Sequence, residues 1–254
     1  MAMADRGRLL GFDASAIGRG PVFNIEVGKE PAHVIVDPEG ARAFVTNGRD
    51  NAVWVIDLAR RRTVKKIGVG KSPHGLRMSP DGSTIYVANT GDGTVSVISI
   101  QELVEVARLP VGKAPVQVGF TPDGRYCYVS LREEDSVAVV ETRSRRVIVK
   151  IPVGSSPIQL FALPNGQEIY VANQGTQATP GNTVSVINVA TQKVVAEIVA
   201  GAGAHGVVVS NSGDRVFIAN TFADTVSEID PASHRVLRTI RVGAGAGGIT
   251  FAGA

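Results

Sequence analysis

Cysteine, aromatic residues, long apolar runs and a strong excess of charge are all scarce in this chain of 254 residues. With one cysteine, Cys127, no disulfide can form within the chain, and its position within an apolar segment predicts a small buried side chain. No apolar run approaches the roughly 20 residues that span a bilayer, so no membrane span is predicted. A net charge of +3 is too small to favour a nucleic acid partner.

Recognisable catalytic motifs are absent as well. The sequence has no nucleophile elbow, P-loop, HExxH or paired-cysteine motif, and it has no CxxCH for haem attachment. A bound haem would therefore need a histidine as its protein ligand. The first residues show no charged segment followed by an apolar one, so no signal peptide is recognised in this chain.

Repetition is the feature that the sequence does have. A turn of the type Pro-Asp-Gly recurs along the chain, and its glycine marks each repeat. The first four of these glycines are 42 residues apart and the last follows after 47 residues: Gly40, Gly82, Gly124, Gly166 and Gly213. Self-similarity at a period near 42 indicates a repeat architecture.

Each repeat contains four short apolar segments separated by polar turns. The second segment ends seven residues after the turn glycine, in the motifs FVTN, YVAN, YVSL, YVAN and FIAN. A third segment of the type VSVID follows, and a fourth leads to the next V-G-x-x-P. Four short antiparallel strands are typical of one blade of a β-propeller. On these motifs the chain resembles the YVTN-repeat, lactonase-like β-propellers over essentially its whole length.

We predict one all-β domain over residues 1–254, a six-bladed β-propeller of four-stranded antiparallel blades. The complete blades are expected at residues 27–67, 68–110, 111–152, 153–199 and 200–241. The sixth blade is split: residues 1–26 supply three strands, and residues 242–254 supply one, over Gly247–Ala252. Pairing the C-terminal strand with the three N-terminal strands would close the ring and remove exposed sheet edges. A seven-bladed parent that has lost a blade is the alternative.

The first strand of each repeat has two kinds of position, because side chains alternate along a strand. Counted from the proline, the fourth and sixth positions are apolar in every repeat, so we predict that they lie between blades. The third, fifth and seventh positions are mixed and often polar, so we predict that they line a central channel. This mixed set includes His33, Ile35, Asp37, Arg77, Gln117, Gln159, Phe161 and Leu163.

Three of the four histidines, His33, His74 and His205, map to one level of the repeat, where the chain enters the first strand. Neutral imidazoles are the commonest metal ligands, and three with an open position suit a catalytic zinc, copper or iron. His74 and His205 are one position out of phase with His33, so they could instead point between blades and bond a neighbouring strand. The fourth, His234, falls in a turn at the opposite face.

Other unusual residues are predicted at the same end of the channel. Arg77 is a charge with no acidic neighbour in its own repeat, and we place it with the three histidines in the catalytic set. Gln117 and Gln159 are expected to orient a polar ligand or to hold channel water. Arg132 and Glu133 are expected to bind ligand, because their loop departs from the repeat; a solvated loop tip is the alternative.

Two classes of function follow. Six-bladed lactonases and related esterases of this fold imply a metal-dependent hydrolase that binds a small lactone, ester or phosphoester in a histidine-bearing pocket. The acidic residues that hold calcium in those lactonases are not evident here. The alternative is a non-catalytic, exported binding module whose rim meets a protein partner. A third resemblance is to propellers that handle haem or copper. The family implies a periplasmic or secreted location.

Overall fold

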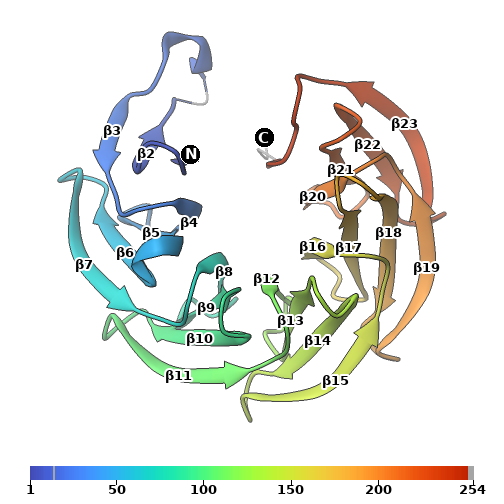
Figure 1. The fold of residues 1–254 in the computed structure, drawn as a ribbon, viewed down its shortest axis with the longest axis horizontal. Coiled ribbons are helices and arrows are strands. Elements are labelled where there is room, and N and C mark those ends of the chain that lie inside the picture. Colours follow the sequence, from blue (N-terminus) through green and yellow to red (C-terminus); the bar gives the residue numbers. More distant parts are fainter. Residues whose placement is uncertain (14, 251–254) are drawn as a thin grey trace. The chain divides into compact units, whose positions relative to one another are not determined.

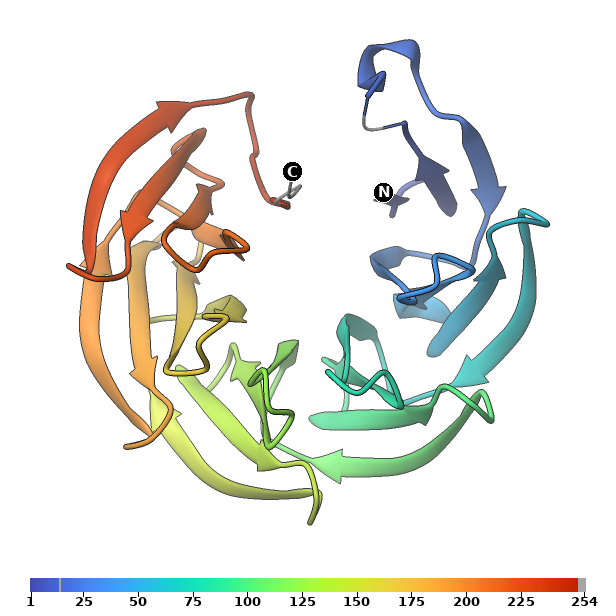
Figure 2. The same ribbon diagram turned by 180° about the vertical axis from the view of Figure 1, so that it is seen from behind.

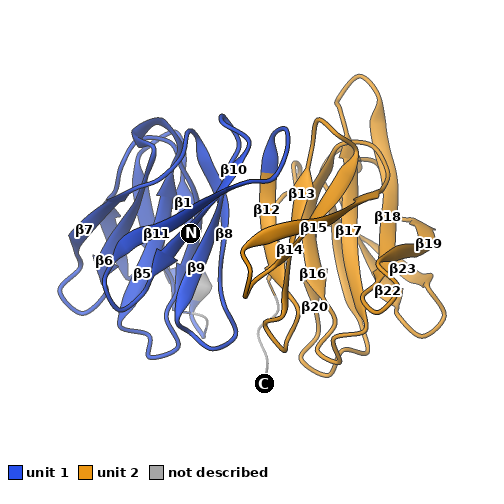
Figure 3. Cartoon of the chain, turned by 90° about the horizontal axis from the view of Figure 1, so that it is seen from below, with its two compact units in different colours: residues 1–115 blue, residues 116–254 orange. Residues whose placement is uncertain are grey.

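The computed structural model describes residues 1–13 and 15–250. Their regular structure consists of strands and two short 3-10 helices, η1 (Ile17–Arg19) and η2 (Gly48–Asp50). No helix in these residues is long and apolar enough to cross a bilayer. The chain divides into two compact units, residues 1–115 and 116–254 (Figure 3). A single domain over residues 1–254 stays a prediction.

The first unit contains three antiparallel sheets whose strands follow chain order (Figure 1). The N-terminal sheet consists of β1 (Ala2–Met3), β2 (Arg8–Gly11) and β3 (Phe23–Glu26). The second consists of β4 (Pro31–Val36), β5 (Arg42–Asn47), β6 (Ala52–Asp57) and β7 (Arg62–Gly68). The third consists of β8 (Pro73–Met78), β9 (Thr84–Asn89), β10 (Thr94–Ser99) and β11 (Val104–Pro110).

The second unit also contains three antiparallel sheets, each of four strands in chain order (Figure 2). The first consists of β12 (Pro115–Phe120), β13 (Tyr126–Leu131), β14 (Ser136–Glu141) and β15 (Arg146–Pro152). The second consists of β16 (Pro157–Ala162), β17 (Glu168–Gly175), β18 (Pro180–Asn188) and β19 (Lys193–Val199). The third consists of β20 (Ala204–Val209), β21 (Val216–Asn220), β22 (Thr225–Asp230) and β23 (Arg235–Arg241).

The all-β class and the antiparallel four-stranded sheets are confirmed, and the N-terminal residues form three strands as predicted. The lone strand predicted over Gly247–Ala252 is not formed over residues 247–250, and residues 251–252 lie outside the described part of the chain. The sheet β1–β3 accordingly has three strands. Ring closure and a count of six blades stay predictions.

Apolar cores join neighbouring sheets within each unit, and they correct the predicted roles of the first-strand positions. Val34 packs in the core toward the N-terminal sheet, whereas the next residue, Ile35, packs in the core toward β8–β11. Leu160 and Phe161 likewise pack in different cores, and Leu163 is also buried in one. The sheets β4–β7 and β16–β19 have a neighbour on each face within their own unit. Both sets of side chains therefore point between sheets, and the predicted channel-lining row is wrong for Ile35, Phe161 and Leu163.

The turn glycines of the repeat behave as predicted. Gly40, Gly82, Gly124, Gly166 and Gly213 have φ angles between 67° and 75°, in the left-handed region that favours glycine. Asp37, predicted to lie low in the channel, instead belongs to the first of these turns. It is buried and accepts hydrogen bonds from the backbone N–H groups of Ala41 and Arg42 and from the Arg42 guanidinium.

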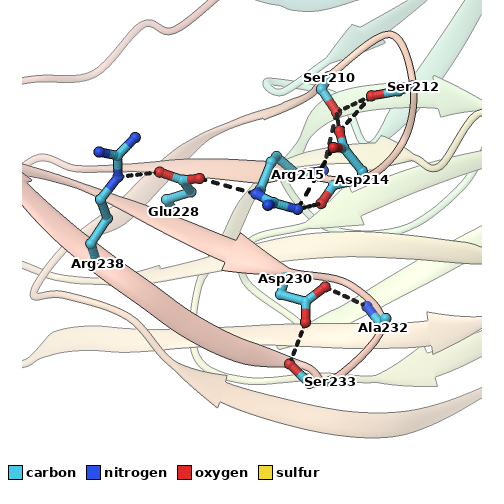
Figure 4. A network of polar contacts seen from close by, with 9 residues as sticks. All are labelled: Ser210, Ser212, Asp214, Arg215, Glu228, Asp230, Ala232, Ser233 and Arg238. Carbon is cyan, nitrogen blue, oxygen red and sulfur yellow. Dashed lines mark hydrogen bonds and ion pairs between the residues drawn. The ribbon is translucent and has the colours of Figure 1, made fainter.

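The corresponding turn of the last sheet continues into a charged network (Figure 4). Glu228, in β22, occupies the position at which the other third strands carry valine, and it is 7% exposed. Arg215 Nε donates to one of its carboxylate oxygens at 3.1 Å, and Arg238 donates to the other. A buried carboxylate is unfavourable unless it is paired, so the two arginines make glutamate tolerable in this strand.

A buried hydrogen-bond group recurs where the second strand ends. In the sheet β8–β11, Asn89 Nδ2 donates to Thr94 Oγ1 at 2.9 Å and to Ser96 Oγ at 2.8 Å. The same serine oxygen accepts from the backbone N–H of Gly70 at 3.3 Å. The two asparagine bonds recur at Asn173 with Thr183 and Ser185, and at Asn220 with Thr225 and Ser227. In these three sheets the motif asparagine is therefore structural: it bonds the third strand of its own sheet.

The glycine of V-G-x-x-P is required by this group. A Cβ atom built on Gly70 would lie 2.5 Å from Asn89 Nδ2, closer than real Cβ contacts come. Gly154 and Gly201 stand in the same relation to their own asparagines, with Cβ to Nδ2 distances of 2.5 and 2.6 Å. In each of these sheets, the asparagine amide can occupy its position only because the residue beside it is a glycine without a Cβ atom.

We expect Gly70→Ala to lower the free energy of unfolding by about 1–3 kcal/mol, because its methyl group overpacks the buried amide. Urea denaturation measures the loss. Gly68→Ala is the matched control: a Cβ there meets nothing within 4 Å, and the change should stay below about 1 kcal/mol. Equal losses in the two variants would contradict the steric role of the amide.

Candidate functional site

The first strands β4, β8, β16 and β20 contain β-bulges near their entry ends, and the predicted histidines lie in three of them. In β4, Ala32 and His33 together oppose the single residue Thr46 of β5. His74 lies in the corresponding bulge of β8, and His205 is the extra residue in β20. A bulge re-aims side chains and often occurs beside functional sites. The predicted direction of these side chains, which assumed regular alternation from the proline onward, therefore does not hold.

His33 and His74 come together within the first unit. Their rings meet edge to face, with centroids 4.8 Å apart and planes at 61°. Both side chains are half-buried. Two imidazoles at this separation can share a proton network, hold a substrate group between them, or offer two nitrogen ligands to one ion. The pair is the part of the predicted histidine site that the structure brings together.

Thr46 holds the two histidine backbones in place. Its hydroxyl oxygen accepts from the His33 N–H at 3.0 Å, and its O–H donates to the His74 carbonyl at 2.7 Å. The side chain is fully buried, so no solvent competes for these bonds. In the second unit, Ser130 bridges Gln117 N–H and Ile158 carbonyl in the same manner, at 3.1 and 2.6 Å.

Sequence reasoning missed Thr46. The available signal is the third letter of the strand motif, which is threonine in FVTN and serine in YVSL but alanine in YVAN and FIAN. A hydroxyl at this position ties the first strand of its own sheet to the first strand of the next sheet.

Arg77 lies on β8, three residues after His74 and beyond the bulge. It pairs with Tyr86 of β9 and is half-buried. Burial lowers the pKa of its guanidinium, but an arginine keeps its charge in proteins. A fixed positive charge in this position can hold a carboxylate or phosphate group.

His205 belongs to the second unit. Its Nδ1 lies 2.8 Å from the carbonyl oxygen of Gly247. Since a carbonyl can only accept, Nδ1 carries the proton and Nε2 keeps its lone pair in the neutral ring. Thr221 Oγ1 donates to the neighbouring carbonyl of Ala246 at 2.9 Å, so the same segment is tied at two points.

The two glutamines are already engaged with the backbone. Gln117 is 1% exposed, and its side-chain carbonyl accepts from the N–H of Val118 at 3.0 Å. Gln159 accepts from the N–H of Val207 in the neighbouring sheet at 3.4 Å. Arg132 and Glu133, by contrast, are exposed in the turn between β13 and β14. Ligand binding by these four residues stays a prediction.

Within residues 1–13 and 15–250, no group of three or more histidine, cysteine, aspartate or glutamate side chains could hold a metal ion. Cys127 is fully buried in β13, and burial raises the pKa of its thiol. Its predicted role as a small buried side chain is confirmed.

Acidification should destabilise the protein partly through His205. Burial lowers the pKa of this imidazole below 6.5, against a smaller opposite effect of the Gly247 hydrogen bond. The unfolded chain then binds the proton more readily, so the contribution of neutral His205 is complete above pH 6.5 and is lost as the pH falls through the folded-state pKa. In urea titrations at several pH values, His205→Gln should lose less stability below pH 6.5 than the unchanged protein. Identical pH dependence in both proteins would contradict this role.

Comparisons with known proteins agree with the sheet architecture. The chain resembles hydrazine synthase of Kuenenia stuttgartiensis with a TM-score of 0.84 and 22% identity, over 95% of this chain and 82% of that one. It also resembles a functionally unknown protein from Desulfotomaculum acetoxidans DSM 771 with a TM-score of 0.74 and 18% identity, over 90% and 76% of the two chains. At these identities the likeness shows the fold. No curated protein matches the sequence.

Family models cover both units. One described as a YNCE-like β-propeller matches residues 162–252. Another, described as a lactonase, 7-bladed β-propeller, matches residues 4–147, which is more than half of the chain. With its repeated antiparallel sheets and YVTN-type motifs, the chain belongs to the lactonase family of β-propellers.

Proposed function

We propose that the protein hydrolyses a lactone, with the His33–His74 pair as the group that activates water. The observation that carries this proposal is the contact between two half-buried imidazoles, with ring centroids 4.8 Å apart, at bulges tied together by Thr46. Membership of the lactonase family supports the choice of reaction. A small, negatively charged lactone is the substrate class that Arg77 would favour.

The chemistry needs one proton to move twice. A neutral imidazole of the pair takes a proton from water as the water oxygen attacks the lactone carbonyl carbon. The ring C–O bond then breaks, and the imidazolium returns the proton to the leaving oxygen, which gives a hydroxy acid. The second imidazole orients the first and stabilises its charged form. Arg77 binds the carboxylate or phosphate group of the substrate through charge-assisted hydrogen bonds.

The metal-dependent form of this reaction has weaker support. The pair supplies two nitrogen ligands, whereas catalytic zinc sites usually have three protein ligands. The described residues contain no cluster that adds a third. In the proposed reaction the two imidazoles and Arg77 act without zinc, copper or iron.

We expect His33→Ala and His74→Ala each to lower kcat/KM for lactone hydrolysis by about 100-fold or more, the usual contribution of a positioned acid–base group. Arg77→Met should mainly raise KM, and only for lactones that carry a negative charge. Hydrolysis is followed by acid release across a panel of neutral and anionic lactones. His234→Gln is the control and should keep full activity, because His234 bonds Glu168 in the second unit.

Elemental analysis of protein purified without a histidine tag tests whether the proposed reaction proceeds without a metal. We expect no stoichiometric transition metal and no loss of activity on chelation. About one equivalent of metal that disappears in the His33→Ala, His74→Ala double variant would contradict it, since two imidazoles plus water or substrate ligands would then form the centre.

A non-catalytic binding module is the second candidate. It is favoured by the exposed Arg132 and Glu133 in the turn between β13 and β14, where this sheet departs from the other repeats. Failure of the unchanged protein to hydrolyse any lactone in the panel would overturn the hydrolase proposal and leave this one.

A further inference from the structure

We propose a second ligand site, for an aromatic ring that bears a negative charge, between the N-terminal sheet β1–β3 and the sheet β4–β7. A cleft of about 1110 Å³ lies there, slightly larger than the usual small-molecule site of about 300–1,000 Å³. Its walls include Arg6 and Arg8 on one side and Trp54 and Lys66 on the other. Neither His33 nor His74 lines it, so the site is separate from the histidine pair.

The cleft lies at the end of β3, where the chain leaves the N-terminal sheet. Its lining includes Glu26, the residues 27–30 that follow β3, and the turn at residues 4–7 between β1 and β2. Opposite them, Trp54 and Lys66 are directly paired across β6 and β7.

Trp54 differs from the residue that the other repeats carry at its position. The equivalent position is occupied by Ser96, Ser185 and Ser227 in three sheets, where the serine accepts from the motif asparagine. Because tryptophan replaces this serine, Asn47 Nδ2 donates to the carbonyl of Val45 instead. The indole Nε1 is buried and has no hydrogen-bond partner among the described residues. Such departures from an otherwise consistent pattern are expected at functional sites.

The indole already acts as a stacking surface. The Lys66 ammonium lies 3.7 Å from the centroid of the ring system, a cation–π contact. Lys66 is exposed and its stem is flexible, so the ammonium can move to the edge of the ring. A flat aromatic ligand can then stack on the indole while the ammonium pairs with its negative group.

The charges that surround the cleft favour an anion. Three of its carboxylates already face arginines, in the pairs Asp5–Arg6, Glu26–Arg8 and Glu30–Arg49, at 3.7, 4.0 and 3.3 Å. The fourth, Asp50, accepts from the backbone N–H of Lys29 at 3.0 Å. The lining thus has five cationic side chains, the three arginines with Lys29 and Lys66, against four carboxylates, and its net charge is +1.

The test uses the fluorescence of Trp54, which is the only tryptophan in the chain and so reports on this cleft alone. Adenosine 5′-monophosphate, which combines an aromatic ring and a phosphate, should quench it saturably. Adenosine and inorganic phosphate should each bind about ten-fold more weakly, since each lacks one of the two interactions. No saturable quenching by the monophosphate, or equal binding of adenosine, would overturn the proposal.

Lys66→Met should weaken binding of the monophosphate about five- to ten-fold and leave adenosine binding unchanged, because it removes the charge and keeps the stem. Lys65→Met is the matched control: Lys65 is the preceding residue of β7, is exposed, and points to the other face of the sheet. Equal weakening in both variants would overturn the assignment to Lys66. Circular dichroism and the native Trp54 emission maximum show that each variant is folded.

Discussion

A buried side-chain amide that must find hydroxyl partners governs the construction of the sheets. Asn89 satisfies its Nδ2 group through Thr94 and Ser96, and the same serine satisfies the backbone N–H of Gly70. Because an unbonded buried amide costs about 1–3 kcal/mol, this group ties the second and third strands to the segment that enters the first. Removal of any member leaves another without a partner. The sheet β4–β7 shows what happens when the serine is lost: the asparagine turns to a backbone carbonyl, and the space goes to Trp54.

The need to pair buried polar groups also limits where reactive side chains can lie. Both faces of the inner sheets in each unit are filled by neighbouring sheets, so polar groups survive where the regular ladder is interrupted. The bulges of β4 and β8 provide that interruption, and Thr46 converts two separate bulges into one positioned pair of imidazoles. Regular sheets supply rigidity here, and local irregularities supply the chemistry.

Much of the fold can be predicted from the sequence, because repeat spacing, turn glycines and strand motifs are local signals. Gly82 and the strand that ends at Asn89 are recognisable without any knowledge of distant contacts. The channel-lining row could not be predicted correctly, since Ile35 and Phe161 alternate properly along their strands but both strand faces meet other sheets. The contact of His33 with His74 depends on a bulge and on a bond from Thr46, and strand periodicity shows neither. Trp54 is visible in the sequence only as a departure from serine, and the cleft beside it is lined by residues within 4–8, 26–30 and 49–66, which the repeat pattern does not bring together.

The bonded residues of the asparagine group lie close together along the chain, and this favours early folding of the individual sheets. The group's most distant bonded members are 26 residues apart at Gly70 and Ser96, and 31 residues apart at Gly154 and Ser185. The sheets that contain Asn89, Asn173 and Asn220 can therefore each complete this group from one continuous stretch of chain, before any neighbouring sheet exists to cover their apolar faces. Contacts of such short range form early, and the slower step is then the docking of finished sheets against one another. During synthesis, the sheets would fold one after another from the N-terminal side. One apolar face of each sheet would stay exposed to solvent until the next sheet had been synthesised.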